Sequence, residues 1–153
     1  MTLQRGETAA DFVLLDHSGQ ECTLADLLRS GPVLLVFFPF AFSPVCHEEL
    51  TLIAEREQEL RAGGVSVVAV SCDPIHALRA YAEKNHLEFP LLSDFWPHGE
   101  VATRFGVFND VAGHPRRVSF LISPEHTVSA VWEAPIWKPR DFDDYLEHVL
   151  RST

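Results

Sequence analysis

One of the three cysteines, Cys46, stands where an apolar run gives way to a polar, helix-forming stretch. The run at 33–38 stops at Pro39, and Ser43 and Pro44 then supply the signals of a helix start, an N-cap followed by a proline. An ordinary thiol has a pKa near 8.5, so only about a few per cent of it is ionised at neutral pH. A helix N-terminus favours the thiolate, because its unpaired N–H groups carry partial positive charge. The pattern therefore predicts a reactive cysteine.

Other chemistries of this cysteine are weighed against that prediction. Free cysteines are often buried and inert, but the helix-start signals around Cys46 favour reactivity. A dithiol oxidoreductase needs a second cysteine at C-x-x-C spacing, and position 49 is Glu. The eight His form no H-x-x-x-H pair, which makes scattered surface histidines a simpler interpretation than a metal site. A cysteine hydrolase with a His base remains conceivable, although no local signature supports it.

Length and charge limit the class of protein. At 153 residues the chain predicts one domain, residues 1–153, with a core of its own. The net charge of −10 and the lack of a Lys/Arg cluster argue against partners such as nucleic acid or an anionic membrane. No apolar run reaches the roughly 18 residues of a membrane span. The start has no apolar secretory segment, so we expect a cytoplasmic, reducing setting.

The elements that must position Cys46 follow from apolar periodicity and turn residues. Unbroken apolar runs at 33–38 and 65–70 predict strands that are buried on both faces. We expect Glu48 and Glu49 to favour the N-terminal dipole of the helix that begins at Ser43 and ends at 63–64. The other expected strands lie at 12–15, 21–24, 89–92, 106–108, 117–122 and 127–132. The other expected helices lie at 24–28, 74–86, 100–105 and 142–150, the last after a linker at 135–140.

This order predicts an α/β fold of the thioredoxin-like kind. Strands that alternate with helices imply a parallel centre, and the late hairpin implies an antiparallel edge. The expected sheet is therefore mixed and flanked by helices, with a β-hairpin at the N-terminal end of the chain.

The residues around Cys46 also carry a resemblance to a known family. Residues 39–46 read PFAFSPVC, which resembles the P-x-x-x-T/S-x-x-C signature of peroxiredoxins, with Glu49 three residues later. Further similarities, some to the AhpE-type one-cysteine branch, lie at 9–12, 70–71, 89–99 and 106–109. Two positions depart from the family pattern: Ser43 replaces the commoner Thr, and Ser123 replaces a common Asp. The hydroxyl at 43 survives, without the methyl that stiffens its rotamer.

The resemblance implies a thioredoxin-like fold and the reduction of hydrogen peroxide, organic hydroperoxides or peroxynitrite. Cys46 would attack the O–O bond and become a sulfenic acid, which an external thiol would restore. In that family pattern Pro39 would shield the sulfur, Ser43 would hydrogen-bond the peroxide and Glu49 would orient an Arg. The resemblance implies no metal, haem or flavin.

Two adjacent arginines compete for the role that the resemblance gives to an Arg. The family spacing R-x-T/S-F occurs here from Arg117 to Phe120, which selects Arg117. On an extended chain Arg116 points to the opposite face, so we expect it to meet solvent or the acidic surface. Cys22 and Cys72 match no resolving position of the family, and we expect both to be structural, with Cys72 the less certain because it ends a buried strand.

The resemblance also implies partners. The reductant would be a low-molecular-weight thiol such as mycothiol, or a glutaredoxin-, mycoredoxin- or thioredoxin-like protein. A homodimer or larger homo-oligomer is expected, and its surface would use some of the aromatic residues at 37–42 and 95–96. The alternative function is a non-enzymatic peroxide sensor that relays its oxidation to a partner protein. Turnover with a small thiol would separate the two.

Overall fold

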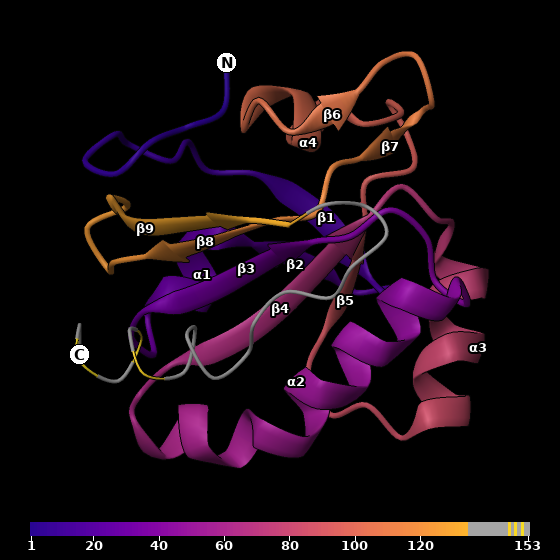
Figure 1. Ribbon diagram of the computed structural model, residues 1–153, viewed down its shortest axis with the longest axis horizontal. Helices are drawn as coiled ribbons and strands as arrows, with labels where there is room; N and C mark the ends of the chain where they lie inside the picture. Colours follow the sequence, from indigo (N-terminus) through magenta and orange to yellow (C-terminus); the bar gives the residue numbers. More distant parts are fainter. Residues whose placement is uncertain (135–146, 148, 150, 152–153) are drawn as a thin grey trace.

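Figure 1 shows the computed structural model, which describes residues 1–134, 147, 149 and 151. Strands and helices alternate through the centre of the chain, as the apolar pattern predicts. The strands are β1 Val13–Asp16, β2 Glu21–Thr23, β3 Val33–Phe37, β4 Ser66–Ser71, β5 Leu91–Ser93, β6 Phe108–Asn109, β7 His114–Pro115, β8 Val118–Ile122 and β9 Val128–Glu133. The helices are α1 Leu24–Leu28, α2 Pro44–Ala62, α3 Ile75–Asn85 and α4 Glu100–Arg104.

Seven of the strands form one mixed sheet in the order β2-β1-β5-β4-β3-β8-β9. The central strands β3, β4 and β5 are parallel, because helices α2 and α3 carry the chain back between them. Strands β8 and β9 continue the sheet antiparallel on one side, and β1 and β2 do so on the other. The parallel centre, the late antiparallel edge and the N-terminal hairpin were all predicted.

The central strand β3 is buried on both faces, and its residues alternate between two cores. Leu34 and Val36 belong to the cluster that packs against α2 and α3. Val33, Leu35 and Phe37 belong to the cluster that includes α1 and α4. Successive side chains of a strand point to opposite faces, so one apolar run serves both layers. Figure 1 shows α2 and α3 together on one side of the sheet.

One expected element differs from the structure, and the last two are largely not described. The strand expected at 106–108 is instead the short β6, which pairs with β7 outside the main sheet. The reason is that Gly106, with φ at +72°, ends α4: its N–H bonds Thr103 O and the N–H of Val107 bonds Ala102 O. The expected linker at 135–140 and most of the expected helix at 142–150 lie outside the described residues. None of the helices described is long and apolar enough to cross a membrane.

Candidate active site

Cys46 lies in the first turn of α2, just beyond the end of the central strand β3. Its side chain is buried, with 2% of the residue exposed. Ser43 is the N-cap and Pro44 the first helical residue, as predicted, and the first helical bond runs from His47 N to Ser43 O at 2.8 Å. The N–H groups of Val45 and Cys46 precede that bond, so the helix itself gives them no acceptor. Within the described residues the Ser43 hydroxyl makes no capping hydrogen bond.

The acidic residues of α2 do not act as expected. The first turn of α2 holds no acidic side chain, because Glu48 and Glu49 come one turn too late. Glu49 instead forms a buried ion pair: its Oε2 lies 2.6 Å from Nη2 of Arg117, and the two side chains are 3% and 0% exposed. Residues three apart share a helix face, so Glu49 lies on the same face of α2 as Cys46. The guanidinium that Glu49 binds is itself shielded from bulk water.

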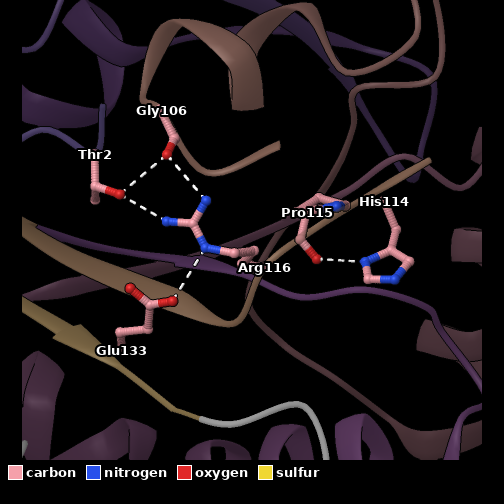
Figure 2. Close-up of polar contacts among 6 residues, drawn as sticks. All are labelled: Thr2, Gly106, His114, Pro115, Arg116 and Glu133. Atoms are coloured by element: carbon pink, nitrogen blue, oxygen red, sulfur yellow. Dashed lines mark hydrogen bonds and ion pairs between the residues drawn. The ribbon is translucent and has the colours of Figure 1, made fainter. Parts of the chain in front are cut away.

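Arg116, the neighbour of Arg117, points away from Glu49 and forms a separate set of hydrogen bonds. Figure 2 shows its Nε bonded to Glu133 Oε2 at 3.0 Å, Nη2 to Thr2 Oγ1 at 2.6 Å and Nη1 to Gly106 O at 3.3 Å. Arg116 thus meets the acidic surface at the exposed Glu133, as expected, and its further bonds to Thr2 and Gly106 were not anticipated. Arg116 cross-links the N-terminal segment, the end of α4 and strand β9, which gives it a structural role.

The loop before Cys46 is held by a carboxylate that the sequence analysis missed. Asp73 Oδ2 accepts hydrogen bonds from Ala41 N at 2.9 Å and from Ser71 Oγ at 2.7 Å. Asp73 thereby ties the loop after β3 to the end of β4. Pro39 is buried where this loop leaves the strand. The sequence predicts a helix from position 74, and nothing local indicates that Asp73, just before it, holds the loop after β3.

A second missed feature is a buried tyrosine beside the first turn of α2. Tyr81 projects from α3 with only 1% exposed, and its hydroxyl lies 2.7 Å from Nδ1 of His47. The ring of Phe42 meets the Tyr81 ring edge-on, with centroids 5.0 Å apart. Burial, and secondarily the charge at Cys46, raises the pKa of Tyr81 to about 12. Tyr81 therefore contacts the residues on both flanks of the segment from Ser43 to Cys46.

Comparison with known proteins bears directly on this site. The sequence model of the AhpC/TSA family matches residues 5–131. Over 120 residues, 78% of each chain, the sequence is 40% identical to alkyl hydroperoxide reductase E of Mycobacterium tuberculosis. Over 137 residues, 86% of each chain, it is 31% identical to peroxiredoxin Bcp of Escherichia coli. The chain is a peroxiredoxin of the AhpC/TSA family.

The fold of this peroxiredoxin agrees with that membership. The crystal structure of peroxidoxin BcpB from Mycobacterium tuberculosis superimposes with a TM-score of 0.88, at 33% sequence identity, over 98% of this chain and 97% of that one. The predicted thioredoxin-like α/β fold is thus confirmed.

The other two cysteines of the peroxiredoxin differ from Cys46 in surroundings. None of the three is in a disulfide. Burial, with Asp16 and Asp26 nearby, raises the pKa of Cys22 to about 11. Burial, with the charges of Asp94 and Asp73, raises the pKa of Cys72 to about 12. Both groups therefore stay protonated at neutral pH, and a protonated thiol is a poor nucleophile.

The aromatic residues around the site of the peroxiredoxin separate into two sets. Phe37 and Phe38 are fully buried in the core, which is the ordinary place for such side chains. Phe40, Phe42, Phe95 and Trp96 are exposed, and Trp96 most of all, at 82%. The described residues contain no group of three or more His, Cys, Asp or Glu that could hold a metal ion.

Proposed function

We propose that this peroxiredoxin, a thiol-dependent peroxidase, reacts with peroxides through the Cys46 thiolate. The sulfur attacks one oxygen of R–O–O–H, so an S–O bond forms while the O–O bond breaks. Cys46 is oxidised to the sulfenic acid, and the departing RO⁻ takes up a proton to leave as an alcohol, or as water when R is hydrogen. A first external thiol then condenses with the sulfenic acid and releases water. A second thiol reduces the mixed disulfide and returns Cys46 to the cycle.

The observation that carries this proposal is the buried pair of Arg117 and Glu49 one helical turn from Cys46. A cation held in a water-poor site stabilises both the thiolate and the charge that develops on the departing oxygen. Glu49 fixes the guanidinium, and a guanidinium held in one position is a preorganised, charged hydrogen-bond donor. The uncapped N–H groups of the first turn and the Ser43 hydroxyl supply further donors, and Pro39 limits access of water to the sulfur.

Organic hydroperoxides are the substrate class that we favour, beside hydrogen peroxide and peroxynitrite. Phe40 and Phe42 are exposed immediately before Ser43, so an alkyl chain that enters there meets apolar rings. The relative at 40% identity carries the name alkyl hydroperoxide reductase E, which agrees with this choice.

The reductant in this proposal is an external thiol, because Cys22 and Cys72 stay protonated and Cys46 acts alone. A low-molecular-weight thiol such as mycothiol fits, and so does a glutaredoxin-, mycoredoxin- or thioredoxin-like protein. The family membership favours such a peroxidase over a sensor that only relays oxidation. The cycle needs a reducing compartment, for which we propose the cytoplasm.

Replacing Cys46 by Ser tests the proposal. We expect Cys46→Ser to consume no peroxide in a single turnover, because a hydroxyl at neutral pH is not a competent nucleophile. Wild-type protein treated with one equivalent of peroxide should gain one oxygen in intact mass, and the variant should gain none. Cys72→Ser is the matched control and should behave as wild type. Undiminished consumption by Cys46→Ser, or a wild-type product that has lost two protons without gaining oxygen, would contradict the proposal.

We also propose that the active form is a homodimer or a larger homo-oligomer. Phe95 and Trp96 lie exposed beside a pocket of about 380 Å³ that is lined largely by apolar residues. Exposed apolar surface of this kind is typical of association sites. The oligomeric state in solution tests this proposal.

A further inference from the structure

Tyr81 contacts the catalytic segment on two sides. Its hydroxyl reaches His47, the residue after Cys46, and its ring meets Phe42, the residue before Ser43. Tyr81 also belongs to the same buried cluster as Cys46 itself. No function assigned above uses these contacts, although Tyr81 is among the largest fully buried side chains of the protein.

The direction of the hydrogen bond follows from the burial of Tyr81. With its pKa raised to about 12, the phenol keeps its proton at any physiological pH. A buried O–H group needs an acceptor, and the acceptor at hydrogen-bond distance is Nδ1 of His47, 2.7 Å away. The phenol therefore donates to Nδ1, which assigns the proton of the neutral imidazole to Nε2. His47 is exposed, so one tautomer is selected on a side chain that otherwise meets water.

The contact with Phe42 fixes a backbone conformation that needs support. Phe42 has φ at +71°, in the left-handed region that bulky residues rarely adopt. Such a conformation persists only where the surroundings hold it. Packing of the Phe42 ring against Tyr81 stabilises this conformation, and so does the hydrogen bond from Ala41 N to Asp73. The position of Ser43, the next residue, depends on this turn.

We propose that Tyr81 is a positioning residue for peroxide reduction, which braces Phe42 and His47 on the two flanks of Cys46 and so fixes the turn from Ser43 to Cys46. This inference rests on the proposed reaction of Cys46 with peroxide. In this role Tyr81 acts through Phe42 and His47 and not on the substrate itself. It sets the direction in which the donors of the turn and the thiolate face an incoming peroxide, and small misplacements of such groups are costly in rate.

Tyr81→Phe is the sharpest test, because it keeps the ring against Phe42 and removes only the hydroxyl. We expect the stopped-flow rate constant of Cys46 oxidation by peroxide to fall roughly three- to tenfold, the range of one neutral hydrogen bond. The fraction of protein that reacts should stay unchanged, since a lost fold lowers the amplitude and lost positioning lowers the rate constant. His47→Ala should slow the reaction by a similar factor, and His47→Asn, whose amide oxygen can accept from the phenol, should recover part of it.

The double variant Tyr81→Phe/His47→Ala separates positioning from general damage. Both single changes remove the same interaction, the hydrogen bond between Tyr81 and His47. The double variant should therefore be about as slow as either single variant. Lys84→Ala, at an exposed position in the last turn of the same helix α3 and outside the pocket of Phe95 and Trp96, is the control and should react at the wild-type rate. A wild-type rate in Tyr81→Phe, or losses that multiply in the double variant, would overturn the inference. If Tyr81→Phe does not fold, the exposed His47 variants decide alone. Peroxide turnover by the wild-type protein and by Cys46→Ser tests the proposed function independently of Tyr81.

Discussion

Arg117 and Glu49, the pair that we propose for catalysis, carry a cost in stability. Both side chains are almost completely buried, and their closest atoms are 2.6 Å apart. Transferring two charges from water is unfavourable, so such a pair adds little net stability. Removing one partner is far worse, because the other charge stays buried and loses this counter-charge, typically at a cost of about 3–5 kcal/mol. We interpret the pair as a device that holds a donor still beside the thiolate.

Arg117→Met should slow peroxide reduction by at least roughly a hundredfold, the usual loss for one preorganised donor. It should also lower the thiolate fraction at neutral pH, which absorbance near 240 nm measures. Because Glu49 then loses this ion-pair partner in a buried place, Arg117→Met/Glu49→Gln serves as a second variant: it removes the buried carboxylate and should remain slow. Arg116→Met is the matched control. It should keep the wild-type rate but lose thermal stability, since it breaks the contacts to Thr2 and Glu133. The opposite ranking of the two arginines would refute our assignment.

At the scale of elements, helix α4 illustrates a cap supplied from outside the helix. Its N-cap is Gly99, which has no side chain to offer, and its backbone is in the left-handed region with φ at +73°. The buried Asp94 supplies the acceptors: Oδ1 bonds Val101 N at 3.1 Å and Oδ2 bonds Ala102 N at 2.8 Å. Val101 and Ala102 both belong to the buried cluster that includes residues of α1 and of strand β3. The cap therefore joins a short helix to the layer that covers one face of the sheet.

Asp94→Ala should lower the free energy of unfolding by about 1–3 kcal/mol, because two N–H groups at the start of α4 lose their acceptors in a buried place. Urea denaturation followed by circular dichroism measures this change. Asp110→Ala, at an exposed carboxylate, is the control and should leave the stability within about 0.5 kcal/mol of wild type. Equal stabilities of the two variants would show that the cap of α4 contributes nothing.

At the scale of the whole molecule, several of the exposed apolar residues gather around one pocket. Leu15, Phe95 and Trp96 line this pocket together with the first residues of α3. A second copy of this chain is the occupant that we propose for this surface. That residues 1–153 form a single domain stays a prediction.

Trp96→Glu should shift the peroxiredoxin from an oligomer to a 17.2 kDa monomer in light scattering at micromolar concentration. The reason is that a carboxylate placed at the centre of an apolar interface loses its hydration without gaining a partner. Leu52→Glu changes an exposed apolar residue of α2 outside the pocket, and it should leave the association state unaltered. A wild-type protein that is already monomeric would rule out the proposed association, and an unaltered oligomer in Trp96→Glu would place its interface elsewhere.

Much of the fold and the reactive residue could be predicted from the sequence, because the signals involved are local. The apolar run of β3, the Ser-Pro helix start before Cys46 and the glycines after α2 each act within a few residues of the feature they determine. The ion pair could be anticipated only through the family resemblance, which implies that Glu49 orients an Arg and whose R-x-T/S-F spacing selects Arg117. Even so, assigning Glu49 to the helix dipole was wrong, since its burial beside Arg117 decides its role.

Only the tertiary structure decided which distant side chains meet. The contacts of Asp73 with Ala41 and of Tyr81 with His47 join positions 32 and 34 residues apart. The direction taken by Arg116 and the exposure of Trp96 also depend on how whole elements pack. Local propensities do not contain this information, because a side chain's partner is set by the register and packing of the sheet and helices. Those in turn result from many weak apolar contacts spread over the entire chain.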